Sequence, residues 1–65
     1  MQIFVNGESH SLQPATLAAA LETLGFGGRK IATAVNGRFV PATQRQATPL
    51  NDGDKVEVVA PMQGG

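Results

Sequence analysis

The feature that most constrains the fold is a pair of Asn-Gly dipeptides, Asn6-Gly7 and Asn36-Gly37, each between two short runs with strand periodicity. A type I′ turn needs a positive φ at both central residues, and Asn-Gly tolerates this well, so each dipeptide predicts a β-hairpin. The first hairpin is expected to join a strand over 1–5 to a more polar edge strand over 8–12. The second is expected to join a strand over 31–35 to a short strand over 38–40.

Between the two hairpins, residues 16–24 have the periodicity of a helix. Apolar residues recur there at i, i+3, i+4 and i+7 from Leu17, which gives a single apolar face. The hydroxyl of Thr16 can cap the first free N–H groups, and Gly25 stands where a left-handed C-terminal cap is expected. A helix this short is not stable alone, so we expect it to pack on the strands.

The last third of the chain predicts a loop, a turn and a strand. Residues 42–50 are polar and without period, and Leu50 is expected to turn inward as an anchor. The composition of residues 51–54 predicts a tight turn. Residues 55–60 predict an interior strand that is apolar on both faces near its end. The expected fold is therefore α+β, a mixed four- to five-stranded sheet with one helix packed on one face.

The face of the sheet away from the helix is expected to stay open. Alternation from their buried neighbours places Phe4 and Val59 on it, and Met62 is counted with the same surface. An exposed apolar patch favours a partner-binding surface. A small protein also exposes apolar surface without any partner, so both interpretations stay open.

Residues 1–60 are expected to form the folded body and residues 61–65 a flexible tail. Five residues extend at most about 17 Å. Gly64 and Gly65 have no Cβ, so they can enter a narrow cleft in a partner. The group delivered there would be the terminal carboxylate of Gly65, reached through Gly64 and Gln63, and a carboxylate is a poor acyl donor until it is activated. The alternative is an ordinary frayed chain end.

Composition excludes several classes of function. The sequence has no cysteine and one histidine, which excludes disulfides, thiolate metal sites, a cysteine nucleophile and metal sites with several histidines. The formal net charge is 0 and no basic run exceeds Arg29-Lys30, which argues against nucleic-acid binding. No apolar stretch approaches the roughly 20 residues of a membrane span. With no export signal either, the expected compartment is the cytoplasm.

Two further features predict little chemistry. The glycine-rich residues 25–30 lack the spacing of a phosphate-binding loop and predict a helix cap followed by a mobile connector. His10 is expected to be an ordinary surface histidine on the second strand.

Five segments carry a family resemblance when taken together: residues 1–7, 16–24, 34–41 and 50–59, and the final Gly64-Gly65. In combination they resemble the β-grasp, ubiquitin-like sulfur carrier proteins, and most closely the ThiS group that serves thiamine biosynthesis. The resemblance covers nearly the full chain. Residues 25–30 depart from the family pattern in being richer in glycine and basic residues.

The resemblance implies a mechanism and a set of partners. An E1-like, ThiF-like adenylyltransferase would use ATP and Mg²⁺ to adenylate the carboxylate of Gly65. A sulfur donor enzyme would then convert it to a thiocarboxylate, which a ThiG-like thiazole synthase would use to build the thiazole ring. Val59 matches the hydrophobic patch that ubiquitin-like proteins present to partners. The chain would be a cosubstrate with no catalytic residue, metal ligand or cofactor of its own.

Other functions of the same fold stay open. The small subunit of molybdopterin synthase and carriers for tRNA thiolation also end in Gly-Gly, although the former tend to be longer. A ubiquitin-like modifier would join Gly65 to lysines through an isopeptide bond. A plain interaction module would make no use of the tail.

Overall fold

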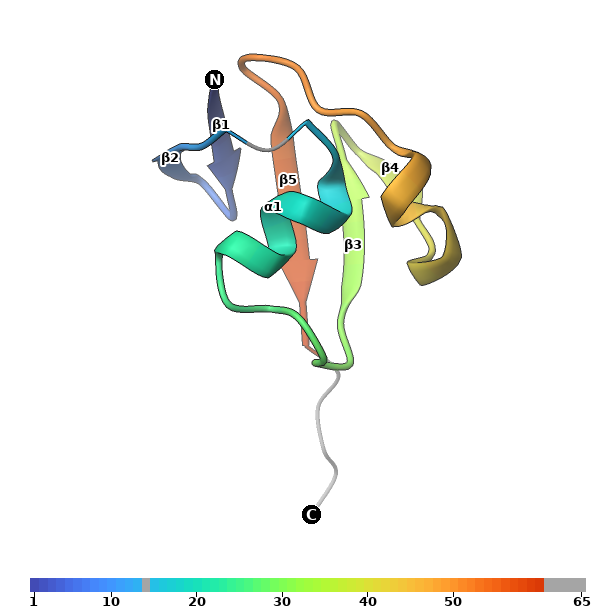
Figure 1. Cartoon of the computed structure of the whole chain (residues 1–65). Coiled ribbons are helices and arrows are strands. Elements are labelled where there is room, and N and C mark those ends of the chain that lie inside the picture. Colours follow the sequence, from blue (N-terminus) through green and yellow to red (C-terminus); the bar gives the residue numbers. More distant parts are fainter. Residues whose placement is uncertain (14, 61–65) are drawn as a thin grey trace.

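The computed structural model describes residues 1–13 and 15–60. The elements run in the order β1 (Gln2–Val5), β2 (Glu8–Ser11), α1 (Leu17–Thr23), β3 (Ala32–Val35), β4 (Arg38–Val40), the 3₁₀ helix η1 (Ala42–Ala47) and β5 (Lys55–Val59). The strands form one sheet in the order β2-β1-β5-β3-β4, with α1 across one face (Figure 1). Only β1 and β5 pair in parallel among the described strands. This arrangement confirms the expected α+β fold. Neither helix of the described residues has the length and apolar character needed to cross a membrane.

Both predicted hairpins are present, and both turns have the expected backbone. The φ angles are 50° at Asn6 and 85° at Gly7, and 51° at Asn36 and 83° at Gly37. Positive φ at both central residues is the signature of a type I′ turn, whose twist matches that of the flanking strands. The polar strand β2 lies at the edge of the sheet, as its composition predicted.

The two turn asparagines also bind the central strand β5. The Asn6 side chain accepts a hydrogen bond from the Val58 backbone N–H (2.8 Å) and donates one to the Val58 carbonyl (3.0 Å). Asn36 Oδ1 accepts a bond from the Lys55 N–H (3.0 Å), and its Nδ2 donates to Asp54 Oδ1 (3.0 Å). Each hairpin is therefore fixed to β5 at its turn. The turn signal alone does not predict these contacts, because the partners lie 52 and 19 residues away.

The helix begins and ends as its sequence predicts. Thr16 Oγ1 accepts a hydrogen bond from the Ala19 N–H at 3.2 Å. Gly25 has φ 90°, its N–H donates to the Glu22 carbonyl, and the Phe26 N–H donates to the Leu21 carbonyl. This pair of bonds is a Schellman motif, which satisfies carbonyls at the helix end.

The core lies between α1 and the helix-facing side of the sheet. Burial alternates along β5, so that Val56 and Val58 face α1 while Lys55, Glu57 and Val59 are exposed. Leu50 is only 4% exposed, which confirms its expected role as an inward anchor. The buried apolar residues of the described chain are Ile3, Val5, Leu17, Ala20, Leu21, Val40, Leu50, Val56 and Val58.

The expectation of an irregular segment over residues 42–50 is wrong, because Ala42–Ala47 form η1. A short 3₁₀ helix buries no periodic apolar face, and η1 has no buried residue, so hydrophobic periodicity could not reveal it. A tertiary contact fixes η1 instead. Arg45 donates from Nε to Thr33 Oγ1 (3.1 Å) and from Nη2 to the Ile31 carbonyl (2.7 Å).

Candidate functional site

One face of the sheet is not covered by α1, and the strand registers define which residues it carries. Alternation on β5 directs Lys55, Glu57 and Val59 away from the core. Phe4 pairs with Lys55 across β1 and β5, and Ala34 pairs with both Glu57 and Phe39. We call this surface the open face. The registers and burial patterns place on it Gln2, Phe4, Ser9, Ser11, Ala32, Ala34, Phe39, Lys55, Glu57 and Val59.

Phe4 and Val59 both project from the open face, as strand alternation predicts, but they do not form one patch. Phe4 is half-buried and stands beside Lys55, four positions before Val59 on β5. At about 3.3 Å per residue this separates the two positions by about 13 Å. The charged side chains of Lys55 and Glu57 lie along the interval. The two predicted residues therefore lie at separate positions on one surface.

On β3, which lies between β5 and β4, the open face carries two alanines. Val59 is 62% exposed and pairs with Ala32, and Phe39 is 70% exposed and pairs with Ala34. We call these four residues the apolar corner. Phe39 is not among the surface residues predicted from the sequence. Phe39 directly precedes Val40 in the strand after the Asn36-Gly37 turn. Because Val40 is buried, strand alternation could have placed Phe39 on the face away from the core.

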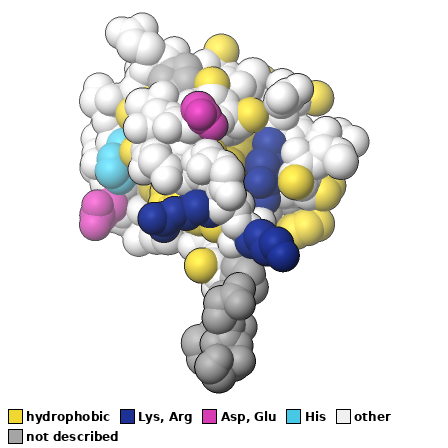
Figure 2. All heavy atoms as spheres, turned by 60° about the horizontal axis from the view of Figure 1, so that its bottom comes forward, with side chains coloured by type: hydrophobic (Ala, Val, Ile, Leu, Met, Phe, Trp, Pro, Cys, Tyr) yellow, Lys and Arg dark blue, Asp and Glu magenta, His cyan; other side chains and the backbone are white. Residues whose placement is uncertain are grey.

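A basic hollow adjoins the apolar corner where β5 ends. It has a volume of about 460 Å³, and Figure 2 shows Lys and Arg side chains gathered with hydrophobic ones on this end of the molecule. Arg29 and Lys30 are exposed and Arg45 is half-buried. We call these three cations the basic cluster. The hollow is lined by Arg29, Lys30, Ile31, Ala32, Ala42, Arg45 and Val59.

The guanidinium of Arg45 is held in place by its bonds to β3. Its partner Thr33 is 2% exposed and donates its own hydroxyl hydrogen to the Val40 carbonyl at 2.8 Å. The chain of contacts runs from Arg45 through Thr33 to Val40, so it joins η1, β3 and β4. Arg45 therefore stabilises the fold and also lines the hollow.

Several of the predicted site residues lie outside the described residues. This applies to Met62, Gln63, Gly64 and Gly65, and to the proposed boundary between the body and the tail. Ala60 is the last residue that the structure describes. It follows Val59 directly, so the chain leaves β5 beside the hollow.

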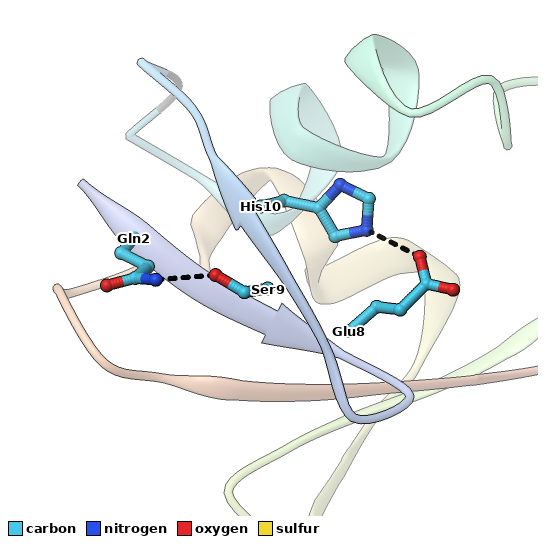
Figure 3. A network of polar contacts seen from close by, with 4 residues as sticks. All are labelled: Gln2, Glu8, Ser9 and His10. Atoms are coloured by element: carbon cyan, nitrogen blue, oxygen red, sulfur yellow. Dashed lines mark hydrogen bonds and ion pairs between the residues drawn. The ribbon is translucent and has the colours of Figure 1, made fainter.

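His10 lies on the second strand and is partly exposed, as expected, but it faces the helix side of the sheet. His10 pairs with Ile3 across β1 and β2, and paired residues share a face, so its ring lies toward α1 with 31% of the side chain exposed (Figure 3). Its Nε2 lies 3.7 Å from Glu8 Oε1. On the opposite side of the same hairpin, Gln2 Nε2 donates to Ser9 Oγ. Within residues 1–13 and 15–60 no three His, Asp or Glu side chains gather as metal ligands.

Comparison with known proteins gives consistent matches. The ThiS family model matches residues 3–65. The sulfur carrier protein ThiS of Thermus thermophilus is 40% identical over 63 residues, which cover 97% of this chain and 98% of that protein. A thiazole synthase of Paramagnetospirillum magneticum is 38% identical over 66 residues, covering 100% of this chain and 20% of its own length. This chain therefore spans about a fifth of that longer relative.

A solved structure has the same fold. The crystal structure of the thiamine biosynthesis protein ThiS from Geobacter metallireducens matches with a TM-score of 0.83 and 28% identity, covering 100% of both chains. The match confirms the β-grasp architecture, in which one helix packs on a mixed sheet of this strand order.

Proposed function

The chain belongs to the ThiS family of sulfur carriers in thiamine biosynthesis, and on this premise we propose that it carries sulfur as a thiocarboxylate on Gly65. The observation that carries the proposal is the extent of the family match, which runs to residue 65 and so includes Gly64 and Gly65. A sulfur carrier protein of nearly equal length supports it.

The proposed chemistry begins with activation of the carboxylate. A Gly65 carboxylate oxygen attacks the α-phosphorus of ATP in an E1-like adenylyltransferase, and pyrophosphate leaves. The outer persulfide sulfur of a donor enzyme then attacks the acyl carbon, and AMP leaves. A thiol reduces the resulting acyl disulfide, which frees the donor thiol and leaves the thiocarboxylate on Gly65. Mg²⁺ and ATP belong to the activating partner. Activation is needed because a free carboxylate offers no good leaving group.

Thiazole synthase is the proposed acceptor of the sulfur. The similar relative named thiazole synthase contains a segment like this chain within a longer polypeptide, which supports a functional association of the two. The chain itself is proposed to act as a cosubstrate and not as an enzyme, and to work in the cytoplasm. Its described residues contribute the fold and the partner-binding open face.

The test is intact-mass measurement after incubation with the cognate ThiF-like enzyme, Mg²⁺-ATP and a sulfur donor. We expect the mass to rise by one oxygen-to-sulfur exchange, and the product to support thiazole formation by thiazole synthase. Conjugates with other proteins on a gel would indicate a ubiquitin-like modifier. Sulfur transfer to a molybdopterin precursor or to tRNA, but not to thiazole synthase, would indicate one of the other carriers. An unchanged mass would contradict the proposal.

Val59→Asp is expected to weaken binding to the activating enzyme by about tenfold or more, because it places a carboxylate in the apolar corner. Val59 is 62% exposed, so the free energy of unfolding should change by at most about 1 kcal/mol. Titration calorimetry measures binding, and thermal denaturation followed by circular dichroism measures stability.

Val59→Ser is the matched variant, because it removes the apolar side chain without placing a negative charge beside the basic cluster. It should weaken binding less than Val59→Asp. A collapse of the melting temperature in either variant would mean that Val59 belongs to the core, and would contradict its assignment to the open face.

A further inference from the structure

We infer that the basic cluster of Arg29, Lys30 and Arg45 docks against an acidic segment of the activating enzyme, at the mouth of the cleft that takes the tail. The inference rests on the proposed function, which supplies the enzyme. It adds a second contact surface that adjoins the open face at Ala32 and Val59 and is separate from the reacting glycine.

Positive charge is unevenly distributed over the chain. The chain has five Lys and Arg residues and a formal net charge of 0, yet three of the five line one hollow. The remaining two lie elsewhere, Lys55 on the open face beside Phe4 and Arg38 at the start of β4. No acidic side chain lines the hollow. The cluster is therefore a local concentration of positive charge on a neutral protein.

The basic cluster has no ion-pair partner in the part of the chain that the structure describes. The ion pair found there is His10 with Glu8, and none involves the basic cluster. Glu22 lines an adjoining hollow together with Arg29 and Arg45, but makes no ion pair with either of them. The positive charge is thus available to groups outside the fold.

The fold holds the guanidinium of Arg45 in place and anchors the backbone at Arg29. Arg45 is fixed by its bonds to Thr33 and to the Ile31 carbonyl. Arg29 and Lys30 follow the Schellman motif of α1, where Phe26 packs against the core and its carbonyl accepts a bond from the Arg29 N–H at 3.2 Å. The Arg45 side chain, which is already held, loses less conformational entropy on binding than a free side chain does.

The place of the cluster favours a protein over a nucleotide. The hollow lies at the end of β5, from which residues 61–65 extend at most about 17 Å when fully stretched. An enzyme that binds ATP at Gly65 and holds the tail stretched therefore meets the cluster with the rim of its cleft, and the phosphates lie at the far end. Three cations on a neutral chain are few for nucleic acid, which normally requires a wider basic surface. Ile31, Ala42 and Val59 line the same hollow, so the acidic segment should also carry an apolar side chain.

The test is a kinetic measurement of adenylation by the cognate ThiF-like enzyme, with ATP–pyrophosphate exchange as the assay. In the double variant Arg29→Glu/Lys30→Glu we expect KM for the carrier to rise by about tenfold to a hundredfold at low salt, because charge at an interface rim mainly governs association. We expect kcat to stay within about twofold, because Gly65 is unchanged. At about 0.5 M salt the difference in KM should largely disappear through screening.

The matched control compares single charge reversals. Arg38→Glu changes the net charge as much as Arg29→Glu does, but on β4, and it should leave KM unchanged. Arg45 is left intact because its loss would also disturb η1. A circular dichroism melt confirms that each variant is folded.

The outcomes separate this inference from the proposed function. If the unaltered chain is not adenylated, the proposed function fails. If it is adenylated but the double variant keeps its KM, or Arg38→Glu raises KM as much as Arg29→Glu, only the docking inference is overturned. A defect seen only with thiazole synthase would likewise overturn it, because it would assign the cluster to a different partner.

Discussion

Deletion of Gly65 is expected to abolish adenylation while leaving the fold intact. The deletion moves the terminal carboxylate back by up to about 3.5 Å, and a misplacement of about 1 Å can already cost a hundredfold in rate. We therefore expect a loss of well over a hundredfold in ATP–pyrophosphate exchange. Every buried apolar residue of the described core lies between Ile3 and Val58, so the free energy of unfolding should change by less than about 0.5 kcal/mol.

Two companion variants separate tail length from the chemistry of the terminal residue. Deletion of Gln63 shortens the tail equally but keeps Gly64-Gly65 at its end, so it should be impaired if reach matters. Gly65→Ala keeps the length and adds one methyl group beside the reacting carbon, so it should retain more activity than the deletion if the cleft is not tight there. Full activity without Gly65 would mean that another group is activated. A large drop in melting temperature would mean that residue 65 contributes to the fold.

Asn6→Ala is expected to be the most destabilising single change at the surface, at about 2–4 kcal/mol. Two hydrogen bonds to Val58 are lost, each worth about 1 kcal/mol, and the part-buried Val58 amide groups lose their partners. A further cost of about 1 kcal/mol comes from placing alanine at φ 50°. A domain of this size has a total stability of roughly 3–10 kcal/mol. Urea denaturation should show a large fall in the midpoint concentration. For a wild-type stability at the low end of this range, the variant should be unfolded even without urea.

The structural reason is that Asn6 extends a strand pairing beyond the end of β1. The Phe4 and Asn6 N–H groups donate to the carbonyls of Asp54 and Val56, which are successive steps of the parallel pairing with β5. At the next step β1 has already turned away, and the Asn6 side-chain amide takes the place of a peptide group against Val58. The side chain thus completes the pairing of β5.

Matched variants divide this cost into its parts. Asn6→Gly also removes the two hydrogen bonds, but glycine adopts a positive φ without strain. Asn6→Gly should therefore be about 1 kcal/mol more stable than Asn6→Ala. Asn6→Asp keeps an acceptor for the Val58 N–H and loses the donor. Asn36→Ala makes the same change at φ 51° in the other hairpin, where the bonds are exposed, and should cost less. Wild-type stability in Asn6→Gly would contradict a role for the side-chain bonds.

The sequence by itself determined the local structure and the family. Asn6-Gly7 and Asn36-Gly37 specify their turns because a positive φ is a property of the residue itself. The caps at Thr16 and Gly25 act within one turn of helix, so neighbours in the chain suffice to define them. Alternation along β5 separated the core from the open face because strand periodicity repeats every two residues. The resemblance to sulfur carriers rested on motifs that the family match also spans.

Only the tertiary structure decided how distant segments combine at the surface. It brought Arg45 of η1 onto Thr33 of β3, and so beside Arg29 and Lys30, which precede β3 in the chain. It set Phe39 and Val59 on one face, on either side of the alanines of β3, and it placed Phe4 of β1 beside Lys55. The physical reason is that such contacts depend on strand order and register, which are set by packing of the whole core and not by any local preference. A polar segment without periodicity, such as Ala42–Ala47, carries no local signal of where it will lie.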